Sequence, residues 1–212
     1  MSERSELRRY PNRGSHDPEV IHKILDEGFL AHVGFNVNGQ PFVIPTLYGR
    51  AGDRLFLHGS AASRMLKELD RGLPACVNVA IVDALVLARS GFHSSINYRS
   101  VVAFGTAKKI RNDEDKAAAL KTISEHVMPS RWREIRGPSE KELKATAVLE
   151  FAIEEASAKI RSGPPLDDEP DYELPVWAGL LPMKFSPGEP VADPRLPAAI
   201  EVPEYVQRYR RS

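Results

Sequence analysis

Hydrophobic residues follow two different periods along this chain, and the first of them is helical. Apolar residues recur at helical spacing between Val20 and Leu25. Asp17 and Pro18 precede them and suit an N-cap and a first helical position, and Gly28 follows. The pattern predicts a helix over residues 18–27.

From Phe29 onward the period becomes that of strands. Asn38-Gly39 separates two apolar runs and is the strongest short hairpin signal in the chain. Further apolar runs rich in Val, Leu and Ala follow, and the run near Asp83 is interrupted. The predicted strands are 29–37, 41–48, 55–57, 98–110 and 146–160, and residues 75–80 and 85–89 form one or two more.

Two residues within these runs carry specific expectations. Pro45 has no N–H to donate, so its strand should be an edge or face something other than a strand there. Gly105 lies inside a long strand and predicts a bend or a bulge.

Three further helices complete the pattern. One should occupy about 61–70 with Met65, Leu66 and Leu69 on its apolar face. A second begins at Asn112 and ends before Pro129, and a third follows Pro138 with capping-box spacing. Strands predominate and the βαβ alternation of a parallel sheet is absent, which predicts a mainly β fold, a β-barrel with α-helical decoration.

The chain divides into three expected segments. Residues 1–16 are polar and should form an N-terminal arm on a partner or on the domain. Residues 17–190 form the domain, with a proline-rich C-terminal wrap from Gly163. Residues 191–212 form a C-terminal tail, in which the run Arg208 to Arg211 should be solvated. The size of 212 residues is compatible with a single barrel domain.

Composition excludes several classes of function. Lys+Arg and Asp+Glu are both 29, which argues against nucleic-acid binding through bulk charge. The single cysteine, Cys76, permits no internal disulfide and no thiolate cluster, and no His or carboxylate group suggests a metal site. No secretory signal and no run of roughly 18 apolar residues is present, so we expect a soluble cytoplasmic protein.

The stretch 54–69 carries the clearest candidate chemistry. A short strand enters the turn His58-Gly59-Ser60, and Ser63-Arg64 follow at the expected helix start. Free N–H groups, a hydroxyl and a guanidinium there would suit a phosphate. The alternative is an ordinary strand–turn–helix corner with Ser60 or Ser63 as N-cap.

With these elements in place, the chain resembles the FMN-binding relatives of pyridoxamine 5′-phosphate oxidase, in the branch that contains the 5-nitroimidazole-resistance reductases. The resemblance covers about residues 17–190. Four blocks carry it: Val43-Ile-Pro45-Thr-Leu-Tyr48; Leu57-His58-Gly-Ser60 with Ser63-Arg64; Asn97-Tyr-Arg-Ser-Val-Val with Gly105; and Val176-Trp177-Ala-Gly-Leu-Leu-Pro182.

The resemblance implies an FMN-binding split barrel that forms a homodimer, with one FMN per subunit at the interface. Ser63 and Arg64 would bind the phosphate, and the backbone of Val43 to Thr46 would lie along the flavin ring. The residues implied in cofactor binding are Val43, Ile44, Pro45, Thr46, Leu57, His58, Gly59, Ser60, Ser63, Arg64, Asn97, Tyr98, Arg99, Ser100 and Trp177.

Several of these residues have a structural alternative. His58 could be a satisfied histidine at a strand end, and Tyr98 and Trp177 could be core aromatics. Arg99 lies in an apolar strand and needs either an anionic ligand, which we favour, or a buried carboxylate. Only Lys184 is charged where the oxidase has a basic segment, so pyridoxamine phosphate is not the expected substrate.

The expected function is that of an FMN-dependent oxidoreductase acting on a small organic substrate such as a nitroaromatic or a quinone. No catalytic acid or base can be named from the sequence. One alternative is a non-catalytic FMN store or sensor. Another is a haem- or deazaflavin-binding relative on the same barrel.

Overall fold

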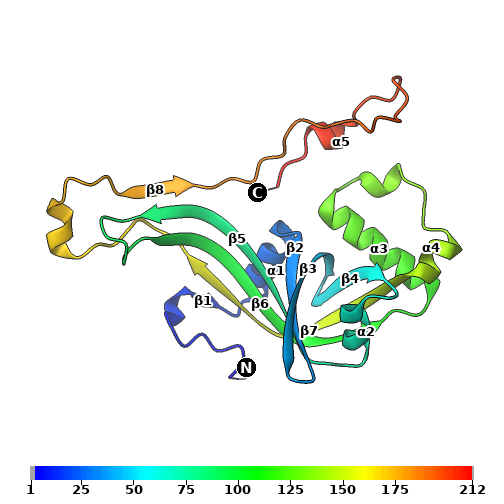
Figure 1. Ribbon diagram of the computed structural model, residues 1–212, viewed down its shortest axis with the longest axis horizontal. Coiled ribbons are helices and arrows are strands. Elements are labelled where there is room, and N and C mark those ends of the chain that lie inside the picture. Colours follow the sequence, from blue (N-terminus) through cyan, green and yellow to red (C-terminus); the bar gives the residue numbers. More distant parts are fainter. Residues whose placement is uncertain (1–2, 212) are drawn as a thin grey trace.

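The computed structural model describes residues 3–211 and is built around one antiparallel sheet that closes on itself. The strand order is β1-β7-β4-β3-β2-β5-β6, and β6 also pairs with β7, which closes the barrel (Figure 1). β8 adds to β5 outside this ring. The strands are β1 (Gly14–Ser15), β2 (Leu30–Val37), β3 (Gln40–Ala51), β4 (Arg54–Ser60), β5 (Ala75–Leu87), β6 (Ser95–Lys109), β7 (Thr146–Arg161) and β8 (Gly179–Pro182).

The helices lie at the margins of the barrel, and their caps follow from the sequence. Asp17 accepts a hydrogen bond from the Glu19 N–H at 2.9 Å, and Ser139 and Glu142 form a capping box. The predicted barrel with helical decoration is thus confirmed. The helices are α1 (Pro18–Glu27), α2 (Arg64–Asp70), α3 (Asp113–Val127), α4 (Glu140–Ala145) and α5 (Glu204–Gln207), with short 3₁₀ turns η1 (Pro11–Arg13), η2 (Arg131–Arg133) and η3 (Glu169–Glu173).

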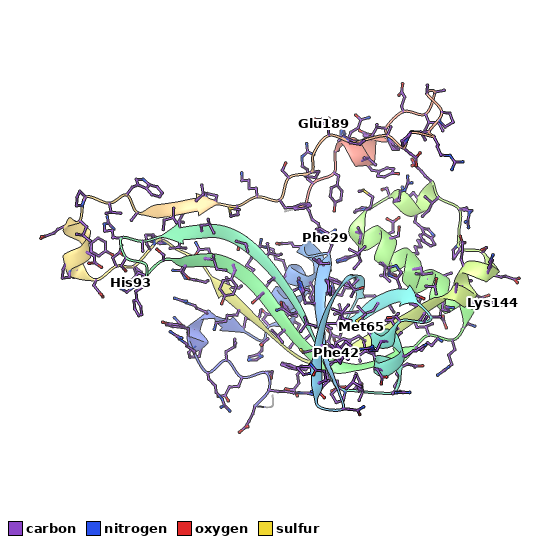
Figure 2. The ribbon with its side chains drawn as sticks, viewed as in Figure 1. Phe29, Phe42, Met65, His93, Lys144 and Glu189 are labelled. Carbon is purple, nitrogen blue, oxygen red and sulfur yellow. The ribbon has the colours of Figure 1, made fainter. Side chains whose placement is uncertain are left out.

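The core fills the barrel and the space under α1 and α2. The buried side chains of α1 and α2 join one cluster with inward residues of the strands, and Phe42 packs against this cluster, which includes Met65 (Figure 2). Tyr48 is fully buried, and its hydroxyl donates to the Leu25 carbonyl at the end of α1. Burial raises the pKa of the Tyr48 hydroxyl.

Two expectations about the strands hold in detail. Asn38 and Gly39 have φ values of 52° and 85°, as a two-residue hairpin turn requires. The β6–β7 register shifts between Phe104 and Gly105, and a Cβ on Gly105 would lie 1.9 Å from the Ala152 carbonyl oxygen. The predicted irregularity at Gly105 is confirmed.

The sequence left open whether residues 75–89 hold one strand or two, and the structure has one, β5, which ends at Leu87. The break near Asp83 is only a bulge between Val82 and Ala84. β6 begins at Ser95, before the predicted start at 98, because its first residues pair with the far end of β5. The far ends of β5, β6 and β7, together with β8 and η3, form an arm that extends beyond the barrel (Figure 1).

Both terminal segments are tied to the domain. β1 pairs with β7, and Arg4 forms an ion pair with Glu155 at 2.9 Å, so the N-terminal segment lies on its own domain. The C-terminal segment runs back from the arm to the barrel (Figure 1). There Arg211 donates to the carbonyls of Glu27 and His126, at the ends of α1 and α3. The prediction that the run Arg208 to Arg211 would be solvated is therefore wrong at Arg211, whose guanidinium satisfies free helix-end carbonyls.

Among the described residues, no helix has both the length and the apolar character needed to cross a membrane.

Candidate functional site

The strands β3 and β4 part at a fork, and the candidate site lies around it. The two strands pair from Ala51 opposite Arg54 to Tyr48 opposite Leu57. Beyond that row β3 continues only against β2, while β4 continues against β7. Residues 42–47 of β3 are therefore left with one edge that carries no strand. Pro45 lies on this edge, so the prediction that it would face no ladder there is confirmed.

On the paired side of the fork, α3 covers the outer face of the sheet. A Cβ on Gly49 would lie 2.7 Å from the Ile123 Cα, so only glycine allows this approach. Phe56 and Val148 pack with Ile123 in a second apolar cluster. Since side chains alternate along a strand, Leu47 and His58, two residues further on, share the face that α3 covers.

A cavity of about 530 Å³ opens at this point, lined by Leu47, His58, α3 and the loop that follows α3. Its walls are largely aliphatic and aromatic, from Leu120 and Val127 on α3 to Trp132 and Ile135 on the loop. Its charged lining residues, Arg136 and Glu142, form a bidentate pair at 2.7 and 2.6 Å. The prediction from sequence missed this cavity, although apolar residues at 127, 128, 132 and 135 interrupt a charged, proline-bounded segment.

His58 supplies the imidazole in the wall of this cavity. Its Nδ1 is buried without a hydrogen-bond partner in the described chain, so it is not the satisfied strand-end histidine of the alternative reading. Desolvation lowers the pKa of His58 below its usual value of 6.5, which favours a neutral ring near neutral pH. A neutral imidazole can accept a proton or ligate a metal ion.

The predicted phosphate corner is shifted along the chain. β4 continues through His58 and Gly59 to Ser60, because these residues pair with β7, so the turn begins at Ala61 rather than at His58. α2 then begins at Arg64, later than the predicted residue 61.

The polar groups of this corner remain available. Ser63 occupies the N-cap position of α2 without a side-chain cap bond, whereas the Ser60 hydroxyl accepts from the Ala62 N–H at 3.2 Å. Arg64 is exposed and lies over the Phe42 ring at 5.4 Å. No carboxylate of the described chain forms an ion pair with Arg64, so its charge can meet an anion.

The other residues predicted on β3 and β4 divide between the surface and the core. Val43 and Pro45 are exposed, Val43 to 67%. Ile44 and Thr46 are partly buried, Ile44 against the core. Leu57 is fully buried, so its predicted contact with a cofactor cannot come from its side chain.

Two predictions on β6 are corrected. The Arg99 guanidinium donates to Asp83 at 2.8 Å and also binds Glu27, so carboxylates rather than an anionic ligand satisfy it. Asn97 is buried and donates to the Gly163 carbonyl at 3.0 Å, so it holds the arm together instead of facing a cofactor. Their neighbours Tyr98 and Ser100 point to the other face of the sheet and are partly buried.

Trp177 lies on the arm, directly before β8, and is 69% exposed, which rules out a core position. The arm with β8 lies at the left of the molecule in Figure 1, whereas α2 lies to the right of its centre, so the two are well separated. The chain therefore does not bring all the predicted cofactor residues together. One group surrounds the fork and α2, and the other lies on β6 and the arm.

Among the described residues, no group of three or more His, Cys, Asp or Glu side chains could hold a metal ion. A histidine that binds the iron of a haem needs no such group, since the porphyrin supplies the other ligands.

Comparison with solved structures identifies two similar chains of nearly the same length. The flavocytochrome Anf3 from Azotobacter vinelandii is 41% identical, with a TM-score of 0.92 over 100% of this chain and 98% of that one. The FAD and haem binding protein from Mycobacterium smegmatis is 36% identical, with a TM-score of 0.87 over 92% of this chain and 96% of that one.

A more distant structure shares the fold. A candidate 5-nitroimidazole antibiotic resistance protein from Bacteroides thetaiotaomicron is 21% identical, with a TM-score of 0.59 over 69% of this chain and 86% of that one. A search of curated proteins finds no match. The family model described as pyridoxamine 5′-phosphate oxidase matches residues 17–160. The chain therefore belongs to the pyridoxamine 5′-phosphate oxidase family, as its sequence motifs predict.

Proposed function

We propose that this protein is a flavocytochrome, a redox protein that binds a flavin nucleotide at the fork and a haem in the cavity under α3. The observation that carries the proposal is 41% identity over the whole chain to a protein described as a flavocytochrome. A second relative, 36% identical, is described as binding FAD and haem. We therefore favour FAD over the FMN predicted from sequence.

The unpaired edge of β3 supports the placement of the flavin. Residues 43–46 pair with β2 on one edge only, so the backbone groups that point to the other edge are taken up by no strand, next to the exposed Val43 and Pro45. Ser63 and Arg64 stand nearby with a hydroxyl and a guanidinium for a phosphate. The bound flavin would supply the hydride and electron chemistry.

A second copy of the chain would complete this site. Within one copy, β8 and the end of β6 that lies beside it are far from the corner at α2 (Figure 1). We therefore propose that Tyr98 and Ser100 of β6, and Trp177 before β8, reach a flavin bound to the other copy. The open edge of β3 and the strands of the arm also carry exposed apolar side chains, including Val43 on β3, Val82 on β5 at 46% exposure and Leu181 on β8 at 50%. We propose a homodimer with a flavin at each of its two equivalent interfaces.

The cavity under α3 supports the haem. Its volume of about 530 Å³ lies within the roughly 300–1,000 Å³ typical of cofactor sites. The apolar lining suits a porphyrin, and α3 with its following loop would exclude water from one side. Leu47 lines the cavity and directly follows the β3 segment proposed for the flavin, so the two sites adjoin.

Cofactor analysis of the purified protein tests the proposal. Cells supplied with a haem precursor should yield a dimer with a Soret band and flavin bands. Mass spectrometry of the released chromophores should find FAD and haem b, each near one per chain. A protein that stays colourless after incubation with FAD, FMN and haemin would overturn the proposal.

An oxidoreductase differs from a flavin store because its flavin is reduced by an electron donor and reoxidised by an acceptor. Reduced nicotinamide or dithionite should bleach the flavin, the haem should become reduced with it, and an acceptor such as oxygen or a quinone should reverse both. A flavin that bleaches while the haem stays oxidised would contradict electron exchange between the sites. If the released chromophore were a deazaflavin, the protein would instead be a deazaflavin-binding relative on the same barrel.

A further inference from the structure

We infer that His58 is the axial ligand of the haem iron, bound through the ring nitrogen that faces the cavity under α3. The inference rests on the proposed function and adds the residue and the place. His58 lines an apolar cavity of about 530 Å³, and its buried Nδ1 has no hydrogen-bond partner in the described chain. A buried ring nitrogen without a hydrogen-bond partner is costly, so the half-buried ring of His58 is the part of the lining that calls for a ligand.

The other histidines have partners or lie elsewhere. The ring nitrogens of His22, His16 and His126 lie 2.7, 3.0 and 2.8 Å from Asp53, the Ala156 carbonyl and the Gly28 carbonyl. His93 Nε2 is also buried without a hydrogen bond, 3.3 Å from the Asp168 carboxylate, but His93 lies on the arm, distant from α3 (Figure 2). His32 is exposed on β2. His58 is the imidazole of the described chain that lines the cavity under α3.

The strand holds His58 in a fixed position. His58 pairs with Val148 of β7, and Val148 is fully buried beneath α3. The side chain therefore projects from a rigid part of the barrel, as a ligand that fixes a metal should. The thioether of Met128 also lines the cavity, but it lies on the loop that follows α3 and not on a strand.

The loop opposite His58 is held in place by the protein itself. The Glu125 carboxylate accepts from the backbone N–H groups of Ser130 at 2.8 Å and Trp132 at 3.0 Å. Tyr205 of α5 donates to Glu134 at 2.6 Å and so ties the C-terminal segment to the same loop. Since these bonds do not involve His58, its replacement should leave the cavity wall folded.

Charge has a smaller role at this site. Arg136 is the arginine that lines the cavity, and its guanidinium could form an ion pair with a haem propionate. Glu142 already accepts two hydrogen bonds from it, so the pair is close to neutral. We therefore expect iron ligation by His58 and apolar burial to determine affinity, and Arg136→Ala to weaken haem binding only a few-fold.

The test uses the purified full-length protein and three variants. His58→Ala removes the ligand, His58→Gln keeps a polar side chain of similar size, and Met128→Leu removes the thioether. His22→Ala is the matched control, since His22 binds Asp53 outside the cavity. Haem per chain, the Soret spectrum, flavin per chain and the melting temperature are measured for each.

Both His58 variants should retain at least ten-fold less haem, with flavin content and melting temperature close to wild type after reconstitution with flavin. Added imidazole should restore a wild-type-like Soret band in His58→Ala, because the free imidazole can occupy the vacated position. His22→Ala and Met128→Leu should keep the wild-type haem content.

If both His58 variants kept the wild-type haem content and Soret spectrum, the inference would be overturned. It would also be overturned if only Met128→Leu lost its haem. These outcomes leave the proposed function intact, because the wild-type protein still binds haem. A wild-type protein that binds flavin but takes up no haem would instead contradict the proposed function and the inference together.

Discussion

The two sides of the fork between β3 and β4 differ in how much of each site a single chain supplies. On the covered side, α3 packs on Gly49 and Phe56, and the cavity next to it has walls from the sheet, a helix and a loop of the same chain. On the open side, residues 42–47 keep an unpaired edge and Val43 is 67% exposed. The same strand thus supplies a wall of a cavity formed within one chain and an edge that no strand of that chain covers.

This difference separates two kinds of dependence. The proposed haem site uses residues of one chain, so changes at the proposed subunit interface should leave it intact. The proposed flavin site requires a second copy, so flavin should be lost together with the dimer. The following variants test that separation.

The largest effect is expected from a charge on the open edge. Val43→Asp should weaken dimerisation at least about 100-fold, since each tenfold change corresponds to about 1.4 kcal/mol and a carboxylate would become desolvated at the interface. Flavin should be lost with the dimer, whereas haem should remain. Sedimentation velocity and cofactor content measure both.

Val191→Asp is the matched control, because Val191 is 94% exposed in the C-terminal segment, away from the fork. It should leave the dimer and the flavin unchanged. A Val43→Asp protein that remains a fully flavinated dimer would show that the open edge is not an interface.

The corner at α2 should contribute to flavin affinity. Arg64→Ala should weaken flavin binding by roughly 1.5–3 kcal/mol, because a charge-assisted hydrogen bond to phosphate is lost. Fluorescence quenching gives the dissociation constant. Arg71→Ala, at the residue that follows α2, where Arg71 pairs with Glu68 at 2.8 Å, should have no effect. Equal losses in both variants would indicate only a general change of charge.

The covered side can be changed through Gly49. In Gly49→Ala the new Cβ would lie 2.7 Å from the Ile123 backbone, so α3 must move, at a cost of about 1–3 kcal/mol in unfolding free energy. Haem affinity should fall as well. In Gly59→Ala the nearest atom is the Leu66 Cδ1 at 3.2 Å, which can move, so that variant should stay within about 0.5 kcal/mol of wild type. Urea unfolding of the apoprotein distinguishes them.

The smallest effect concerns pH. Burial is the main cause that lowers the pKa of His126 from its usual 6.5, while its ring contacts the Gly28 carbonyl where α3 meets α1. Above pH 6.5 the ring is neutral in both states. As the pH falls further, the unfolded chain binds a proton first, so folding is destabilised by at most about 1.4 kcal/mol per pH unit.

Unfolding free energies between pH 7.5 and 5 measure this effect. His126→Gln should have a shallower dependence on pH than wild type, whereas His32→Gln, at an exposed position, should not. Identical slopes in wild type and His126→Gln would show that His126 does not contribute.

The sequence predicted the open side of the fork, where Pro45 has no ladder partner, but not the cavity on the covered side. Periodicity and caps gave the barrel, α1, the hairpin at Asn38 and the missing ladder at Pro45, because these depend on local chemistry. The cavity could not be seen in this way, since it arises where Leu47 and His58, eleven residues apart, meet a loop about 80 residues later.

Residue roles on β6 failed for a related reason. Arg99 was expected to need a ligand, but its carboxylates Asp83 and Glu27 lie 16 and 72 residues away, and no local pattern reveals such pairing. Asn97 belongs to a matching motif, yet the loop at Gly163 folds back onto it. Motif matches located the strands correctly, whereas tertiary contacts determined which side chains stayed available.

Anomalous diffraction at the iron absorption edge from crystals of the haem-loaded protein tests the central claim most directly. The account predicts one iron peak per chain in the cavity under α3, within bonding distance of a ring nitrogen of His58, with flavin density along residues 43–46 at the interface of two copies. An iron peak at any other histidine, or at the dimer interface, would contradict it.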